Sequence, residues 1–111
     1  MKEPDILPVE IGLSVMAFNG RDYLVYHQHD VWGTPLLSDD KWRILVDDSL
    51  MMRVIRNPGS YGYSKGLFEI SFFNPRNRRV SRIFESEWLD TILGHLTEAE
   101  VLEWLSKAEE A

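Results

Sequence analysis

Apolar and polar residues alternate along the first part of the chain with the two-residue period of a β-strand. Residues 9–18 follow this pattern, which predicts a half-buried strand. Asn19-Gly20 comes next and favours a tight hairpin turn, because both central positions need positive φ. Residues 22–28 are rich in aromatic and β-branched side chains, so strands 9–18 and 22–28 are predicted to form a hairpin. The apolar positions of the first strand are Val9, Ile11, Leu13 and Val15.

The middle of the chain contains a predicted connection and an ambiguous segment. Residues 31–41 hold several turn-forming residues and predict a loop, in which Ser38 is able to cap a helical turn. Residues 42–56 fit either two strands joined at 47–49 or a single helix. At 100° per residue their apolar side chains surround the axis, so a helix would have to be buried on every side. A domain this small hardly supplies such an environment, and the hairpin is favoured.

A third hairpin is predicted after a loop. Residues 57–66 are rich in Gly, Ser and Pro and predict that loop. Residues 67–73 again alternate between apolar and polar side chains and predict a strand. Residues 74–77 predict a turn, because the proline ring fixes φ near the value that the second turn position needs. Residues 79–84 are the predicted returning strand.

Two helices are predicted at the C-terminal end. Ser86 caps the first, whose apolar side chains fall within about 140° of arc, and Gly94 and His95 end it. Thr97 and Glu100 form the capping box of the second. We expect Trp88 and Trp104 in the core of this helical part. Trp32 and Trp42 flank the predicted loop, where partial exposure is expected.

Together these elements predict an α+β fold. An antiparallel β-meander of about six strands is expected to carry a C-terminal helical hairpin packed on it. A small barrel closed by the same helices is the alternative arrangement. Residues 1–8 are predicted to be a flexible arm, and 9–111 a single domain that is strand-rich over 9–84 and helical over 86–110.

Composition supports a small globular domain in a reducing compartment. The chain has 111 residues, of which 44% are apolar and 27% charged, close to the globular norm. It contains no cysteine, which excludes disulfides and thiolate metal sites and fits the cytoplasm. The N-terminus lacks the pattern of a signal peptide, and no apolar run approaches the roughly 20 residues that span a bilayer. We expect a cytoplasmic protein that does not enter the membrane.

The net charge of −6 hides an uneven distribution. Residues 51–83 hold seven basic residues and one acidic residue, whereas the rest of the chain is strongly acidic. The charges either neutralise each other within the domain or form surfaces that steer a partner. Overall acidity makes a long polyanion an unfavoured partner.

Three sets of residues are candidates for contact with a partner. Guanidinium groups suit bidentate recognition of carboxylate or phosphate, and the basic hairpin consists of Arg76, Arg78, Arg79 and Arg82, with Arg53 and Arg56 on a neighbouring strand. Loop aromatics suited to stacking on bases are Tyr61 and Tyr63. The acidic helices contribute Glu87, Asp90, Glu100, Glu103 and Glu110.

His27 and His29 are a candidate metal site. At positions i and i+2 of a strand, both imidazoles point the same way. Spacing fixes no third ligand, and the competing interpretation is two surface histidines at the end of a strand. The chain contains no Gly-rich phosphate loop, hydrolase elbow or zinc-protease motif, so an enzyme is not expected.

These observations favour a small, acidic, non-enzymatic binding protein without a cofactor. It is expected to occlude a site on a larger protein or nucleoprotein, as an inhibitor, immunity or anti-defence factor does. The first alternative is a nucleic-acid-binding module that uses the basic hairpin and the loop tyrosines. The second is a metal-dependent enzyme at His27 and His29.

Overall fold

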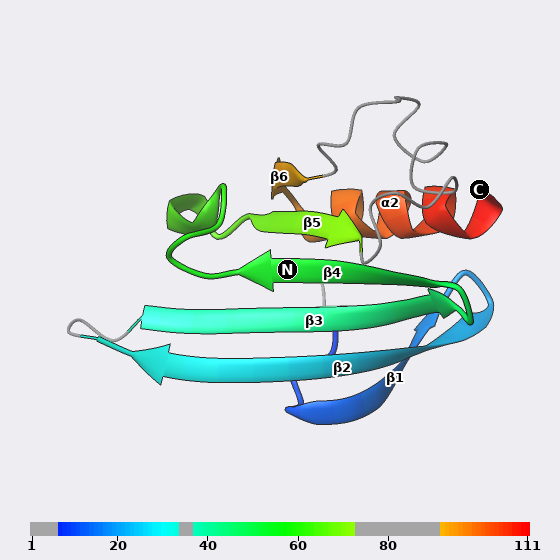
Figure 1. Ribbon diagram of the computed structural model, residues 1–111, viewed down its shortest axis with the longest axis horizontal. Coiled ribbons are helices and arrows are strands. Elements are labelled where there is room, and N and C mark those ends of the chain that lie inside the picture. The colour runs from blue at the N-terminus through cyan, green and yellow to red at the C-terminus, as the bar shows by residue number, and fades with distance from the viewer. Residues whose placement is uncertain (1–6, 34–36, 73–91) are drawn as a thin grey trace, which may run out of the picture.

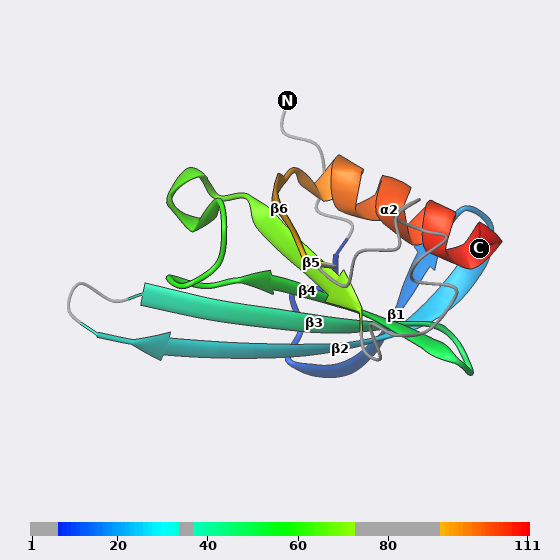
Figure 2. The same cartoon turned by 45° about the horizontal axis from the view of Figure 1, so that its top comes forward.

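In the described residues, a six-stranded antiparallel sheet is crossed by helix α2 (Figures 1 and 2). The computed structural model describes residues 7–33, 37–72 and 92–111. The elements are β1 (Gly12–Phe18), β2 (Arg21–Trp32), β3 (Leu37–Asp47), β4 (Leu50–Arg56), a 3₁₀ turn (Tyr63–Lys65), β5 (Phe68–Phe72), β6 (Leu93–Leu96) and α2 (Glu98–Glu110). Each strand pairs with its neighbour in sequence, which confirms the predicted meander. The sheet is open, with β1 and β6 at opposite edges, so the barrel alternative is wrong.

The first two hairpins follow the sequence pattern closely. Asn19 and Gly20 have φ angles of 53° and 72°, as the tight turn between β1 and β2 requires. The ambiguous segment 42–56 is a hairpin rather than a helix, with Trp42 opposite Val54. The strand pattern is decisive here because alternate residues of both strands face one common core.

The predicted connection over 31–41 is wrong in extent. β2 continues to Trp32 and β3 begins at Leu37, and Ser38 pairs with Val31 instead of capping a helical turn. The strands extend past the turn-forming residues because the antiparallel ladder satisfies the backbone hydrogen-bonding groups on both sides.

The predicted helical hairpin is not supported: the described residues contain one helix, residues 86–91 of the expected first helix lie outside them, and the end of that helix is a strand. Leu93–Leu96, expected at the end of the first helix, is strand β6 and pairs with β5. His95 has a φ of 58°, which is incompatible with a continuing helix. A Cβ added at Gly94 would lie 2.3 Å from Cβ of Tyr61, so glycine permits this close approach. The capping residue Ser86 and the returning strand 79–84 lie outside the described residues.

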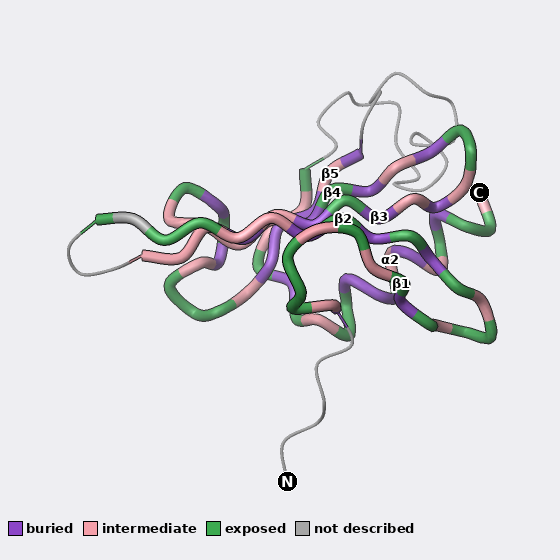
Figure 3. Tube along the Cα trace, turned by 90° about the horizontal axis from the view of Figure 1, so that it is seen from below, coloured by how far each residue is buried: buried purple, intermediate pink, exposed green. Residues whose placement is uncertain are grey.

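Helix α2 forms as predicted and covers one face of the sheet, which we call the inner face (Figure 2). Its capping box is complete: the Thr97 hydroxyl accepts a hydrogen bond from the Glu100 amide, and the Glu100 carboxylate accepts one from the Thr97 amide. Its buried residues are Val101, Leu102, Leu105 and Ala108. They belong to one core with inner-face residues that include Tyr23, Val25, Trp42, Ile44, Val46, Met52, Val54 and Ile70 (Figure 3). Among the described residues, no helix combines the length and apolar character needed to cross a membrane.

The tryptophans depart in part from expectation. Trp42 is buried rather than partly exposed, because its position on β3 faces inward. Trp104 is only half-buried, with the Lys107 ammonium 4.4 Å from its ring centroid. Trp88 and the side chain of Trp32 lie outside the described part.

Candidate functional site

The apolar side chains of β1 lie on the outer face of the sheet, away from α2. Met16 and Ser14 pair with Tyr23 and Val25, so the small and polar positions of β1 share the inner face with core residues. Leu13 is therefore 71% exposed, although its apolar alternation typically marks the buried side of a strand. Residues 12–18 of the predicted strand 9–18 form β1, residues 9–11 precede it, and the side that carries Leu13 and Val15 faces solvent.

These exposed residues are continuous with others across the outer face. Leu13 pairs with Tyr26, which pairs with Arg43, and Val15 pairs with Leu24. All five side chains are exposed. An open hollow of about 370 Å³ is lined by Leu13, Leu24, Tyr26, Gln28, Arg43, Leu45 and Met51. We call these seven residues together with Val15 the outer-face patch.

A pair of arginines stands at one side of the outer-face patch. Arg43 on β3 lies directly opposite Arg53 on β4, and both are exposed. Guanidinium groups bind carboxylates in a forked geometry, which makes this side of the patch suited to a partner's acidic side chains.

Arg53 and Arg56, grouped by the sequence prediction, point to opposite faces of the sheet. Arg56 lies on the inner side, with its guanidinium carbon 4.8 Å from the ring centroid of Phe68 and 5.8 Å from that of Trp42. Its Nη2 is 3.9 Å from Oδ2 of Asp40. The residues of the basic hairpin proper, Arg76, Arg78, Arg79 and Arg82, lie outside the described residues.

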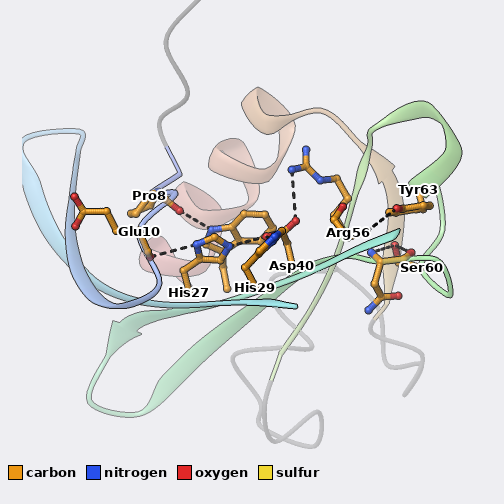
Figure 4. A network of polar contacts seen from close by, with 11 residues as sticks. Pro8, Glu10, His27, His29, Asp40, Arg56, Ser60 and Tyr63 are labelled. Atoms are coloured by element: carbon orange, nitrogen blue, oxygen red, sulfur yellow. Dashed lines mark hydrogen bonds and ion pairs between the residues drawn. The ribbon is translucent and has the colours of Figure 1, made fainter. Parts of the chain in front are cut away.

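His27 and His29 point to the same side, as predicted, and both contact one carboxylate (Figure 4). Nε2 of His27 is 2.8 Å from Oδ1 of Asp40, and Nδ1 of His29 is 2.7 Å from the same oxygen. Asp40 lies directly opposite His29 across β2 and β3 and is only 5% exposed. A buried carboxylate requires such partners, because burial removes its hydration. We call these three residues the His–Asp cluster.

Residues 7–10 cross the sheet beside the His–Asp cluster. The carbonyl of Pro8 accepts a hydrogen bond from the Trp42 indole at 2.8 Å, and the carbonyl of Glu10 lies 3.3 Å from Nδ1 of His27 (Figure 4). The Leu7 amide donates to the Glu98 carboxylate at 2.9 Å, and the Leu7 side chain is buried. Within the predicted arm 1–8, Leu7 and Pro8 are thus attached to the domain, whereas residues 1–6 lie outside the description.

The geometry of the His–Asp cluster suits structural support. One ring nitrogen of each histidine is directed at Asp40, and the second nitrogen of His27 faces a carbonyl. In the described ranges, no group of three His, Asp or Glu residues has an arrangement that could hold a metal ion. Asp40 was one of several aspartates available to the histidines from the sequence, and spacing did not select it because residue 40 was placed in a loop rather than in a strand paired with β2.

The two loop tyrosines have different environments. Tyr61 is 63% exposed, with its ring centroid 6.4 Å from that of His95. Tyr63 is half-buried, and its hydroxyl accepts a hydrogen bond from the Ser38 amide at 3.3 Å. Of the pair, Tyr61 is the more accessible for stacking on a partner.

Some acidic residues of α2 are exposed to solvent, whereas Glu109 contacts the sheet. Glu100, Glu103 and Glu110 are exposed, whereas Glu87 and Asp90 lie outside the described residues. Glu109 joins α2 to β2: it accepts a hydrogen bond from the Tyr23 hydroxyl and forms an ion pair with Arg21 at 3.0 Å.

This contact between α2 and β2 changes the ionisation of its members. Burial of Tyr23, together with its hydrogen bond to Glu109, raises the pKa of Tyr23 to about 12. The same hydrogen bond, assisted by Arg21, lowers the pKa of Glu109. At neutral pH the Tyr23 hydroxyl is therefore protonated and the Glu109 carboxylate is charged. Together with the Arg21 guanidinium they link α2 to β2.

Comparisons of the chain with protein-family models, with curated proteins and with solved structures find no match.

Proposed function

We propose that this protein is a non-enzymatic binding protein that docks the outer-face patch onto a protein partner and occludes a site there. The supporting observation is the run of exposed apolar side chains on the sheet face that α2 leaves uncovered. Large exposed apolar patches with polar rims are typical of interaction sites. An inhibitor, immunity or anti-defence factor acting in the cytoplasm is the class of function proposed.

The composition of the patch favours protein binding. Tyr26 and Arg43 are neighbours across β2 and β3, and tyrosine and arginine are enriched among residues that dominate binding energy. Leu13 and Leu24 surround the same hollow, and full burial of such a side chain contributes about 1.5–3 kcal/mol. The patch thus offers an apolar centre with a cationic side.

The chemistry of the partner follows from this arrangement. An apolar side chain of the partner fits the hollow of about 370 Å³, and a carboxylate beside it meets Arg43 and Arg53. A long polyanion is a poorer match, since the whole chain carries a charge of −6 and would repel it beyond the contact.

A photocrosslinking experiment identifies the partner through the patch itself. A photoreactive phenylalanine replaces Tyr26 in one variant and the more exposed Tyr61 in a control. We expect one protein to crosslink in host cells through position 26 and not through position 61. No position-specific adduct in host cells contradicts docking through this face.

Affinity measurements on the purified pair then test the residues. Leu24→Asp and Arg43→Glu should each raise the Kd at least about tenfold, since each 1.4 kcal/mol lost is a factor of ten. Val31→Asp is the matched control: Val31 is 52% exposed on the same strand but lies outside the patch. Unchanged affinity of both patch variants would refute the proposal. Salt-sensitive retention on RNA or DNA that Arg43→Glu abolishes would instead support the nucleic-acid alternative.

A further inference from the structure

Strand β1 is an edge strand whose own sequence and register lack the charges, prolines and bulges that protect many edges. It lies at one end of the strand order, and its sequence, GLSVMAF, contains no charged residue and no proline. Its pairing with β2 runs in continuous register from Gly12 to Phe18, without a bulge. Natural proteins protect such edges with charges, prolines or bulges, because half of the backbone groups of an edge strand point away from the sheet.

An open hollow runs along this edge. Its volume is about 430 Å³, and it is lined by Leu7, Pro8, Val9, Glu10, Ser14, Val15, Met16 and Ala17. Successive side chains of a strand alternate between the faces of the sheet. A hollow that touches consecutive residues from Ser14 to Ala17 therefore faces the edge, where the backbone is, rather than one face alone.

We propose that the occupant of this edge is β1 of a second copy of the chain, antiparallel to the first across a two-fold axis at Val15. This register places Val15 opposite its own equivalent and Leu13 opposite Ala17 of the other copy, all on the outer face. Gly12 pairs with Phe18 and Ser14 with Met16 on the inner face. No pair in this arrangement brings like charges together, so the strand is complementary to itself.

The two edges of the sheet differ in a way that favours a closed dimer. Strand β6 has only four residues, and His95 within it adopts a φ of 58°, which interrupts a regular ladder. Pairing of β1 with β6 of the next copy would be a head-to-tail contact that continues into a filament. Self-pairing of β1 uses a seven-residue edge on both copies, in which the positive φ of 102° falls at the terminal Gly12, and it stops at two.

The dimer would have a consequence for the outer face. Leu13 and Val15 of the two copies become neighbours, so two outer-face patches form one continuous surface over twelve strands. The dimer contact uses the backbone of β1, whereas Leu24 and Arg43 lie on β2 and β3. Failure of the dimer and failure of partner binding are therefore separable by mutation.

Sedimentation equilibrium tests the dimer directly. We expect the wild-type protein to dimerise, and Val15→Lys to raise the dimer Kd at least about tenfold by placing two ammonium groups opposite each other. Val31→Lys is the matched control, because Val31 on β2 is 52% exposed against 59% for Val15. Leu24→Asp should leave the dimer intact. A wild-type protein that is monomeric up to about 1 mM, the weakest affinity of interest, overturns the proposal, as does a dimer that Val15→Lys leaves unchanged.

A disulfide test keeps the proposal open to refutation if Val15→Lys fails to fold. The chain has no cysteine, so Val15→Cys carries a single thiol that is able to pair only with another copy. Directly opposite residues of antiparallel strands place their Cβ atoms about 4.5–5.5 Å apart, close to the separation in a disulfide. Under mild oxidation, Val15→Cys should form covalent dimers at least about tenfold faster than Val31→Cys, as fixed proximity raises the effective concentration of one thiol at the other. Equal rates for the two variants overturn the proposal.

Discussion

His27 and Trp42 face each other across β2 and β3 with ring centroids 4.6 Å apart and ring planes within 3° of parallel. The stack brings Nε2 of His27 to Asp40 and leaves the indole N–H of Trp42 free to donate to the Pro8 carbonyl. One cross-strand pair therefore connects the His–Asp cluster to the segment 7–10. This arrangement gives the histidines a role in stability that their sequence spacing does not reveal.

Replacement of Asp40 should be among the most destabilising polar substitutions in the protein. Asp40→Ala leaves buried His27 without its carboxylate partner and removes the ion pair with Arg56. Loss of one member of a buried charged network costs about 3–5 kcal/mol, and urea denaturation should show a decrease in unfolding free energy of that order. The exposed Asp30→Ala is the control and should change it by less than about 0.5 kcal/mol. Equal stability of the two variants would contradict the assigned role.

Zinc should not stabilise the protein through the His–Asp cluster. His27 and His29 already direct nitrogens at Asp40, and no three-ligand group that could hold a metal occurs within residues 7–33, 37–72 and 92–111. Thermal melting with and without a zinc excess should therefore give the same Tm. A rise in Tm that His29→Ala abolishes would favour the metal-site alternative, since a ligand that binds only the folded state stabilises it.

Stability should fall at alkaline pH through Tyr23. The folded-state pKa of about 12 lies above the ordinary value of 10, so the contribution is fully present below pH 10 and is lost as pH rises from 10 to 12. Two pKa units correspond to about 2–3 kcal/mol. Tyr23→Phe should remove this pH dependence, whereas Tyr26→Phe, on the exposed outer face, should retain it. Denaturation curves at pH 9 to 12 provide the comparison, and a persistent decrease in Tyr23→Phe would contradict the assignment.

The contact between Gly94 and Tyr61 should be sensitive to a single methyl group. Gly94→Ala places a Cβ 2.3 Å from Cβ of Tyr61, and relief of such a clash costs about 1–3 kcal/mol. Gly59→Ala is the control, because its added Cβ would meet only a side-chain oxygen of Asn57 at 3.6 Å. In a double-mutant cycle, Tyr61→Gly, which removes the Cβ that the new methyl group would meet, should recover part of the loss. Additive effects of the two substitutions would argue against the contact.

Local sequence signals were sufficient for the elements whose structure depends on adjacent residues. Asn19-Gly20 predicted the first turn and Thr97 with Glu100 the start of α2, because each motif satisfies its own backbone requirements. The absence of an apolar helical face over 42–56 likewise favoured the hairpin that the structure shows. The helix expected before residue 96 failed for the opposite reason: the residues of β6 are held by pairing with β5 and by contact with Tyr61, both distant in sequence.

The sequence by itself determined strands β1 to β5, helix α2 and the pairing of successive strands, because alternation, turn propensity and capping act over a few residues. Only the tertiary structure decided which side of β1 faces solvent, since that depends on where α2 packs. The same holds for the contact of both His27 and His29 with Asp40. These outcomes depend on strand register and helix packing, which join residues far apart in the chain and are therefore not encoded in any local pattern.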